Sequence, residues 1–174
     1  MRVAKFGGSS LADAGCFGHV CNIVKADSRR HIVVVSAPGK RFKEDTKVTD
    51  LLIECAKKRI KAKHDCAQAR LEEIIARYQE IAGCIADSEA ADSVMAQIRD
   101  DLESRLATDF DDTDEGRSWF TDLMKAAGED NSARMMAAAL RDRGVAAKYV
   151  NPCEAGLLLS DEAGNAQVLR EAYD

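Results

Sequence analysis

The sequence lacks a hydrophobic run long enough to cross a membrane, and it lacks a signal-peptide pattern. It has no stretch of about 18 consecutive uncharged apolar residues, the length that a membrane-spanning helix needs. The N-terminus runs directly into a strand-like segment instead of a cleavable leader. We therefore expect a cytoplasmic protein that does not bind membranes.

An excess of basic residues is also missing. The chain has 25 lysines and arginines against 30 acidic residues, so its formal net charge is −5. Proteins that bind nucleic acid over a broad surface usually carry the opposite charge. We therefore expect no nucleic-acid partner.

Paired metal-ligand motifs are a third absence. The six cysteines are scattered and form no Cys-x-x-Cys pair, whereas structural zinc sites usually depend on such pairs. We expect these thiols to act as small hydrophobic side chains in a reducing compartment. We also expect no metal site built from the protein's own side chains.

What the chain does contain suits one globular domain. Its 174 residues are 46% hydrophobic and 32% charged, which is enough apolar material for a substantial core. Arg2–Phe6 predicts a strand and Leu11–Ala26 predicts a helix. The apolar run within His31–Ser36 predicts a central parallel strand that is buried on both faces. Together these segments predict a βαβ unit.

The middle of the chain, about residues 46–127, predicts a helical subdomain. Its apolar residues recur every three or four positions, which is the period of an amphipathic helix. The predicted helices are Lys47–Ile60, one with the stripe Leu71 to Ile81, one with the stripe Val94 to Leu106, and Ser118–Ala127. An acidic loop, Asp109–Asp114, precedes the last of them. We interpret this zone as a lid or dimerisation subdomain inserted into the α/β body.

The last part of the chain predicts a return to α/β structure. Glu129–Asp142 has a helical pattern that ends near Gly144. Val145–Asn151 predicts a strand, and Ala155–Leu159 and Ala166–Leu169 predict further short strands.

The first ten residues place a lysine beside two glycines and two serines. Lys5 stands near the carboxyl end of the first predicted strand, where α/β sheets bind ligands. Gly7 and Gly8 let the backbone turn sharply and approach a ligand, and Ser9 adds a hydroxyl at the start of the next helix. These features predict a phosphate-binding loop. The same spacing also fits an ordinary glycine-rich turn with a surface lysine.

Two further motifs are expected near the same edge of the sheet. Ser36-Ala37-Pro38-Gly39-Lys40-Arg41 follows the second predicted strand and places positive charge there. Gly128-Glu129-Asp130-Asn131-Ser132 predicts a junction of loop and helix, with Glu129 in the first turn and Ser132 helping to cap it. Taken alone, Glu129 also fits a structural role at the helix dipole.

These three motifs, in this order, resemble those of aspartate kinases in the amino-acid-kinase superfamily. The likeness rests on Lys-Phe-Gly-Gly-Ser-Ser, on Val-Val-Ser-Ala-Pro-Gly-Lys-Arg with Thr-Asp-Leu-Leu, and on Gly-Glu-Asp-Asn-Ser, and it runs from Val3 to Cys153. The resemblance implies an α/β fold, a three-layer α/β/α sandwich of the carbamate-kinase type. It also implies transfer of the γ-phosphoryl group of ATP to the β-carboxylate of L-aspartate, with Mg²⁺. This reaction begins lysine, threonine and methionine biosynthesis.

The resemblance also implies roles for particular residues. Those that match the phosphate-binding positions are Lys5, Gly7, Gly8 and Ser9. Among them, Lys5 matches the lysine that neutralises the transferring phosphoryl group. Those that match the aspartate-binding positions are Ser36, Thr49 and Glu129, with Glu129 holding the α-amino group. The aspartate carboxylate is already ionised at neutral pH, so the reaction needs no histidine or cysteine as general base.

The resemblance covers the N-terminal portion of such enzymes. Family members continue with an arginine that clamps the substrate, a nucleotide lobe and usually ACT regulatory domains, which we expect beyond Asp174. We therefore expect residues 1–174 to be inactive alone. The intact protein is expected to form a homo-oligomer, a dimer.

Three alternatives accompany this interpretation. The first is another kinase of the superfamily, acting on acetylglutamate, glutamate, carbamate or a nucleoside monophosphate. The second is a non-catalytic binding or dimerisation module. The third, a dinucleotide-binding unit, is disfavoured because Gly-Gly-Ser-Ser lacks the third glycine of that motif and no acidic residue ends the second strand.

Overall fold

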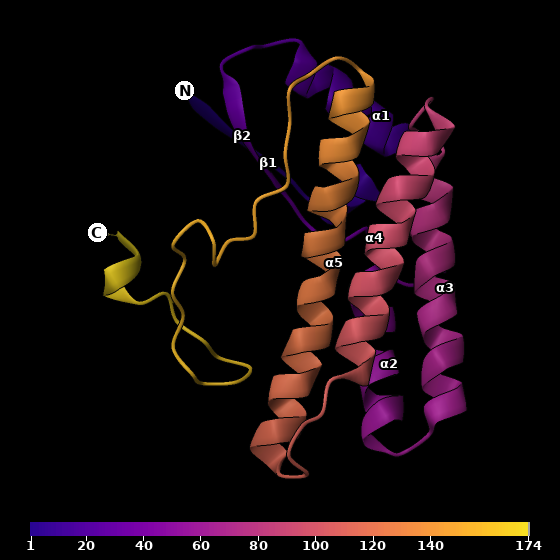
Figure 1. The fold of residues 1–174 in the computed structure, drawn as a ribbon, viewed down its shortest axis with the longest axis vertical. Helices are drawn as coiled ribbons and strands as arrows, with labels where there is room; N and C mark the ends of the chain where they lie inside the picture. Colours follow the sequence, from indigo (N-terminus) through magenta and orange to yellow (C-terminus); the bar gives the residue numbers. More distant parts are fainter. Residues whose placement is uncertain (174) are drawn as a thin grey trace.

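The computed structural model describes residues 1–173 and begins with the expected βαβ unit (Figure 1). Its elements are β1 (Arg2–Phe6), a 3-10 turn η1 (Gly8–Leu11), α1 (Ala14–Lys25) and β2 (Arg30–Val35). The two strands pair in parallel, with Phe6 opposite Val35. Asp13 begins α1, because its side chain accepts a hydrogen bond from the backbone N–H of Cys16 at 2.8 Å. The predicted strand–helix–strand order is confirmed.

The expected burial of β2 on both faces is wrong for the part of the chain that the structure describes. Val35 is buried and Val33 is half-buried against the helices, whereas Ile32 and Val34 are 44% and 45% exposed. Side chains alternate between the faces of a strand. The helices therefore cover one face of the two-stranded sheet. A continuous apolar run does not by itself show that the other face is covered as well.

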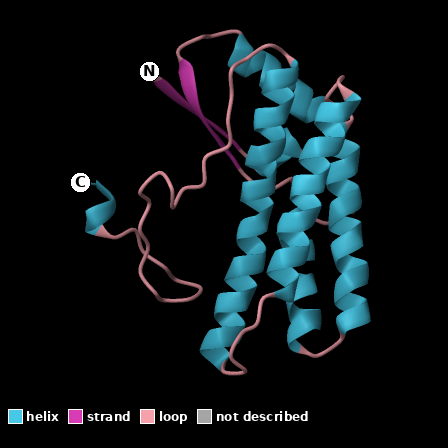
Figure 2. Cartoon of the chain, viewed as in Figure 1, coloured by secondary structure: helices cyan, strands magenta, loops and turns pink. Residues whose placement is uncertain are grey.

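Within residues 1–173, a bundle of four long helices follows the βαβ unit (Figure 2). They are α2 (Val48–Ile60), α3 (His64–Ala82), α4 (Ser88–Ala107) and α5 (Asp114–Asp142). Successive helices run in opposite directions (Figure 1). The predicted apolar stripes are confirmed as buried faces, from Leu71 to Ile81 in α3 and from Val94 to Leu106 in α4. Leu11 and Phe17 belong to the same hydrophobic core as these stripes, so the bundle and the βαβ unit are packed together.

The predicted break at residue 128 is wrong, because α5 runs without interruption from Asp114 to Asp142. An interior glycine weakens a helix by only about 1 kcal/mol relative to alanine, which the packing of a long helix outweighs. Gly128 has a packing role, since a Cβ placed on it would lie 2.7 Å from the Cβ of Ala37. The glycine therefore lets α5 approach the segment after β2 closely. Thr113 caps the true start of the helix by accepting from the N–H of Gly116 at 3.0 Å.

The expected strand at Val145–Asn151 is also wrong. In the described structure this segment is an irregular connection that leaves the end of α5, and it forms no ladder with β1 or β2 (Figure 1). A strand needs a neighbour that supplies its hydrogen bonds. The two short strands expected after it are reduced to one antiparallel bridge between Leu159 and Val168. A 3-10 turn, η2 (Arg170–Tyr173), follows.

None of the helices described within residues 1–173 is long and apolar enough to cross a membrane.

The packing at Gly128 gives a prediction for stability. Gly128→Ala should lower the free energy of unfolding by about 1–3 kcal/mol, because the added methyl group overpacks the contact with Ala37. Gly18→Ala in α1 is the matched control, since a Cβ there meets only the end of the Arg143 side chain at 3.5 Å. That control should stabilise by about 0.5–1 kcal/mol through helix propensity. Urea unfolding of both variants measures the two effects, and equal stabilisation by both would contradict the packing role.

Candidate functional site

The two glycine turns that follow β1 and β2 lie against each other. The backbone N–H of Gly39 donates to the carbonyl oxygen of Gly8 at 2.9 Å. A Cβ on Gly8 would lie 2.8 Å from the carbonyl oxygen of Ala37, and one on Gly39 would lie 2.7 Å from the carbonyl group of Gly8. Such distances exclude any side chain at either position without a backbone shift. Both glycines are therefore required by contact between the backbones.

Lys5 and Gly7 lie at the carboxyl end of β1, beside this contact. The ammonium nitrogen of Lys5 is 3.9 Å from the point that a Cβ on Gly7 would occupy, so the side chain lies over the turn. Lys5 and the Ser9 side chain are both exposed. The pairing of the strands continues into the turn, because the N–H of Ser36 donates to the carbonyl oxygen of Phe6 at 3.1 Å. A cation and a glycine turn thus lie at the same edge of the sheet.

The bundle reaches this edge through two helices. The carboxylate of Glu129 in α5 accepts from the backbone N–H of Ala37 at 3.3 Å. At the start of α2 the N–H of Val48 donates to the carbonyl oxygen of Pro38 at 3.1 Å, which brings Thr49 in the first turn of that helix close to the same loop. Segments that were far apart in the sequence therefore converge on residues 36–39.

The predicted site residues all lie close to residues 36–39. Each of them belongs to this loop or stands no more than three positions from a residue that contacts it. Ser132 lies three residues after Glu129, but its expected capping role is wrong because it lies inside α5 and is fully buried. Glu129 likewise lies in the middle of α5 and not in a first turn. Its carboxylate therefore binds a backbone N–H of a neighbouring loop instead of the start of its own helix.

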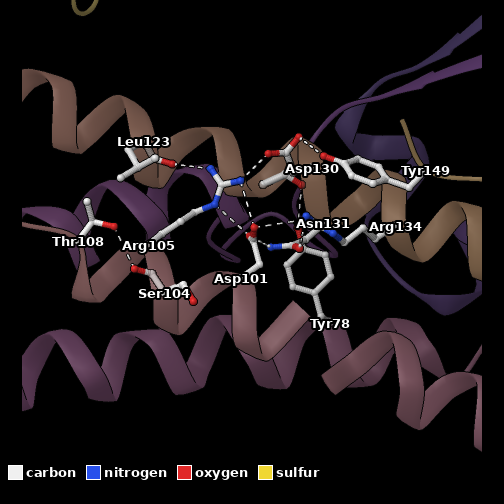
Figure 3. Close-up of polar contacts among 11 residues, drawn as sticks. Tyr78, Asp101, Ser104, Arg105, Thr108, Leu123, Asp130, Asn131, Arg134 and Tyr149 are labelled. Atoms are coloured by element: carbon white, nitrogen blue, oxygen red, sulfur yellow. Dashed lines mark hydrogen bonds and ion pairs between the residues drawn. The ribbon is translucent and has the colours of Figure 1, made fainter. Parts of the chain in front are cut away.

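A polar network holds α5 in place next to Glu129 (Figure 3). Arg105 of α4 binds Asp101 at 3.0 Å and Asp130 at 2.5 Å, and it donates to the carbonyl oxygen of Leu123 at 2.9 Å. The hydroxyl of Tyr149 donates to the second oxygen of Asp130 at 3.0 Å. The side chains of Arg105, Asp101 and Asp130 are 15%, 14% and 14% exposed. The rotation of α5 about its own axis is thereby fixed, and with it the direction of Glu129.

Tyr78 of α3 supports the same stretch of α5 from inside the core. Its hydroxyl donates to the carbonyl oxygen of Gly128 at 2.8 Å, and the side chain is fully buried. Burial raises the pKa of the Tyr78 hydroxyl, so that the group remains a neutral donor. Gly128 is therefore fixed on one side by Tyr78 and on the other by Ala37.

Sequence reasoning missed Arg77, which lies beside Tyr78 on α3. Its side chain is buried and contacts both the loop after β2 and the residue that follows η1. The spacing in the sequence does indicate a buried position for Arg77. It follows Ile74 by three positions and precedes Ile81 by four, which puts it on the buried stripe. A charged residue in such a stripe requires internal partners.

The described residues do not form a metal centre of their own. No group of three or more histidine, cysteine, aspartate or glutamate side chains within residues 1–173 is arranged to hold a metal ion. Mg²⁺ is commonly bound through substrate phosphates with few protein ligands.

The network around Arg105 predicts a large difference between two arginines of α4. Arg105→Met should lower the free energy of unfolding by about 2 kcal/mol, because it removes the ion pairs of Arg105 with two largely buried carboxylates, Asp101 and Asp130. Arg99→Met is the control, because the exposed ion pairs of Arg99 with Glu72 and Glu103 should contribute less than about 0.5 kcal/mol. Thermal and urea unfolding measure both. Equal losses would show that the buried network does not stabilise α5.

The model of the amino acid kinase family matches residues 1–173. The chain is 46% identical to aspartokinase 3 of Bacillus subtilis (strain 168), over 99% of this chain and 36% of that protein. It is 32% identical to the bifunctional aspartokinase/homoserine dehydrogenase 2 of Escherichia coli (strain K12), over 96% of this chain and 19% of that protein. The chain thus spans little more than a third of one relative's length and about a fifth of the other's.

Solved structures give the same fold. Escherichia coli aspartokinase III in complex with lysine and aspartate aligns with a TM-score of 0.76 at 22% identity, over 98% of this chain and 35% of that chain. The aspartate kinase of Clostridium acetobutylicum aligns with a TM-score of 0.64 at 28% identity, over 91% of this chain and 31% of that chain. The predicted α/β fold class is confirmed. The family model covers nearly every residue, and the chain belongs to the amino acid kinase family.

Proposed function

We propose that the protein from which this chain derives is an ATP-dependent aspartate kinase. It would transfer the γ-phosphoryl group of ATP to the β-carboxylate of L-aspartate and form 4-phospho-L-aspartate. The observation that carries the proposal is the convergence of three motif segments on residues 36–39, with Lys5 over one side and the Glu129 carboxylate bonded to Ala37. The similarity to aspartokinase 3 and to other aspartokinases supports the same substrate.

The phosphate side of the proposed site consists of the turn after β1. Lys5 would place its ammonium group against the transferring phosphoryl group, and Gly7, Gly8 and Ser9 would bind the β- and γ-phosphates through N–H and hydroxyl groups. Escherichia coli aspartokinase III has been solved with aspartate and ADP, which supports a nucleotide as the phosphate-bearing ligand. Mg²⁺ bound to the phosphates would neutralise part of their charge.

The aspartate side consists of groups from β2, α2 and α5. Glu129 would bind the α-amino group, because a carboxylate fixed beside a backbone turn is a suitable partner for an ammonium group. The hydroxyls of Ser36 and Thr49 would orient the substrate carboxylates. The β-carboxylate is the nucleophile and is ionised at neutral pH, so the chain's task is to hold it in line with the phosphoryl group and not to remove a proton.

Two other functions differ from this one in ways that the same residues can test. An acetylglutamate kinase would bind a substrate whose amino group is acylated and uncharged, so a carboxylate at position 129 would not favour it. A binding or dimerisation module would use the helices without needing Lys5.

We further propose that the intact protein is a homodimer and that residues 1–174 alone are inactive, since they span 36% of the Bacillus relative.

Removing the charge of Lys5 gives the direct test of phosphoryl transfer. In the full-length protein, Lys5→Met should lower kcat by about 100-fold or more, because a preorganised cation at the transition state is lost. Lys57→Met, on the exposed face of α2, is the control and should retain the wild-type rate. Formation of 4-phospho-L-aspartate, followed with hydroxylamine, measures both. Unchanged activity in Lys5→Met would exclude the proposed role, and no product from the wild type would exclude the kinase.

Neutralising Glu129 tests which substrate the site binds. Glu129→Gln should raise the KM for aspartate about tenfold or more and leave the KM for ATP within about twofold, since one charged contact with the amino group is lost. Glu115→Gln, at the exposed start of the same helix, should change neither. N-acetylglutamate and glutamate serve as competing substrates in the same assay. A preference for the acetylated substrate would contradict the proposal.

A further inference from the structure

Arg77 joins three separate segments through a single guanidinium group. Its Nη2 donates to the carbonyl oxygen of Gly39 at 3.0 Å and to that of Ala12 at 3.1 Å. Its Nη1 donates to the carboxylate of Asp45 at 2.6 Å. Arg77 is 4% exposed, so these bonds form out of contact with solvent. One side chain of α3 therefore holds both the loop after β2 and the end of η1.

The contacts of Arg77 lie directly behind the two glycine turns. Gly39 uses its carbonyl oxygen to bind Arg77 and its N–H to bind the carbonyl oxygen of Gly8. Ala12 immediately follows η1, the turn that starts at Gly8. Arg77 thus contacts Gly39 of the second turn and the residue that follows η1 at backbone atoms.

Asp45 keeps the guanidinium in this orientation. Its side chain is 8% exposed and also accepts from Arg41, at 2.9 Å from both the backbone N–H and Nε. These bonds, first from the Arg41 side chain and then from Arg77, hold the pKa of the Asp45 carboxyl well below its usual range. Asp45 is therefore ionised at neutral pH and pairs with Arg77. A buried ion pair of this kind contributes little net stability. A geometric role therefore explains the presence of the pair better than a contribution to stability does.

We propose that Arg77 is a positioning residue that sets the distance between the two glycine turns and so shapes the phosphate-binding loop. This role depends on the proposed function in one respect, namely that the turn from Gly7 to Ser9 binds the phosphates of ATP. Arg77 touches no substrate and acts through the backbone of Gly39 and Ala12. Lysine cannot replace it fully, because a single ammonium group does not present the planar fork that reaches two carbonyl groups and a carboxylate together.

The deciding variant is Arg77→Lys in the full-length protein. It keeps the positive charge beside Asp45 and loses the fork, whereas Arg77→Met leaves Asp45 buried without this partner and can fail to fold. Arg70→Lys on the same helix is the matched control, because Arg70 makes ion pairs with the more exposed Glu54 and Glu73. Two measurements are made on each protein: amide hydrogen exchange without substrates, and steady-state kinetics.

Hydrogen exchange tests the positioning independently of catalysis. Without substrates, the amide of Gly39, which donates to Gly8, should exchange about tenfold faster in Arg77→Lys, the effect of losing one hydrogen bond to a charged donor. Amides in the centre of α4 should be unchanged. Unaltered exchange at Gly39, or a uniform rise over the whole chain, would overturn the proposal whether or not the protein proves to be a kinase.

Kinetics then separates positioning from general stability. Arg77→Lys should raise the KM for ATP about tenfold and leave the KM for aspartate within about twofold, because Arg77 acts through backbone groups that support the turn proposed to bind the phosphates. A parallel rise of both constants, or no change in either, would contradict the proposal. If the wild type makes no 4-phospho-L-aspartate, the proposed function fails, and the exchange at Gly39 still decides the role of Arg77.

Discussion

The contact between the backbones of Gly8 and Gly39 is the constraint on which the candidate site depends. The two turns are joined by a 2.9 Å hydrogen bond, and neither position has room for a Cβ. This contact brings the carboxyl ends of β1 and β2 together as a single surface. Lys5 and Ser36 share that surface because the strands are parallel and end side by side. Separating the turns would move the groups that are proposed to bind phosphate away from Ser36, which is proposed to bind the aspartate.

The helical bundle acts as the support for this contact. Arg77 and Tyr78, which are adjacent on α3, bind the carbonyl groups of Gly39 and Gly128. Through Gly128, α5 reaches the loop after β2 and presents Glu129 to it. Long helices that share a core with the sheet are suited to this task, since rigid elements position a site more accurately than loops do. The bundle therefore fixes the site's geometry, besides any role as a lid or an interface.

The sequence predicted those elements whose pattern is local. The continuous β-branched run of β2 indicates a strand, and the apolar stripes of α3 and α4 follow from the helical period of their side chains. Gly128 was misread as a break because its reason is a contact with Ala37, 91 positions earlier in the printed sequence. Whether a strand is buried on both faces, as was expected of β2, depends on the elements that pack against it. Whether the segment after α5 forms a strand depends on a pairing partner. A strand-like pattern specifies neither. The site motifs were found through resemblance, and the contacts of Arg77 became visible only in three dimensions.

A crystal structure of the full-length protein with L-aspartate, Mg²⁺ and a non-hydrolysable ATP analogue tests the central claim most directly. The account predicts phosphate oxygens at about 3 Å from Lys5 Nζ and from the N–H groups of the Gly7–Ser9 turn. It also predicts the aspartate amino group on the carboxylate of Glu129, with the hydrogen bond between Gly39 and Gly8 intact. A nucleotide bound elsewhere, or an aspartate that does not contact Glu129, would contradict it.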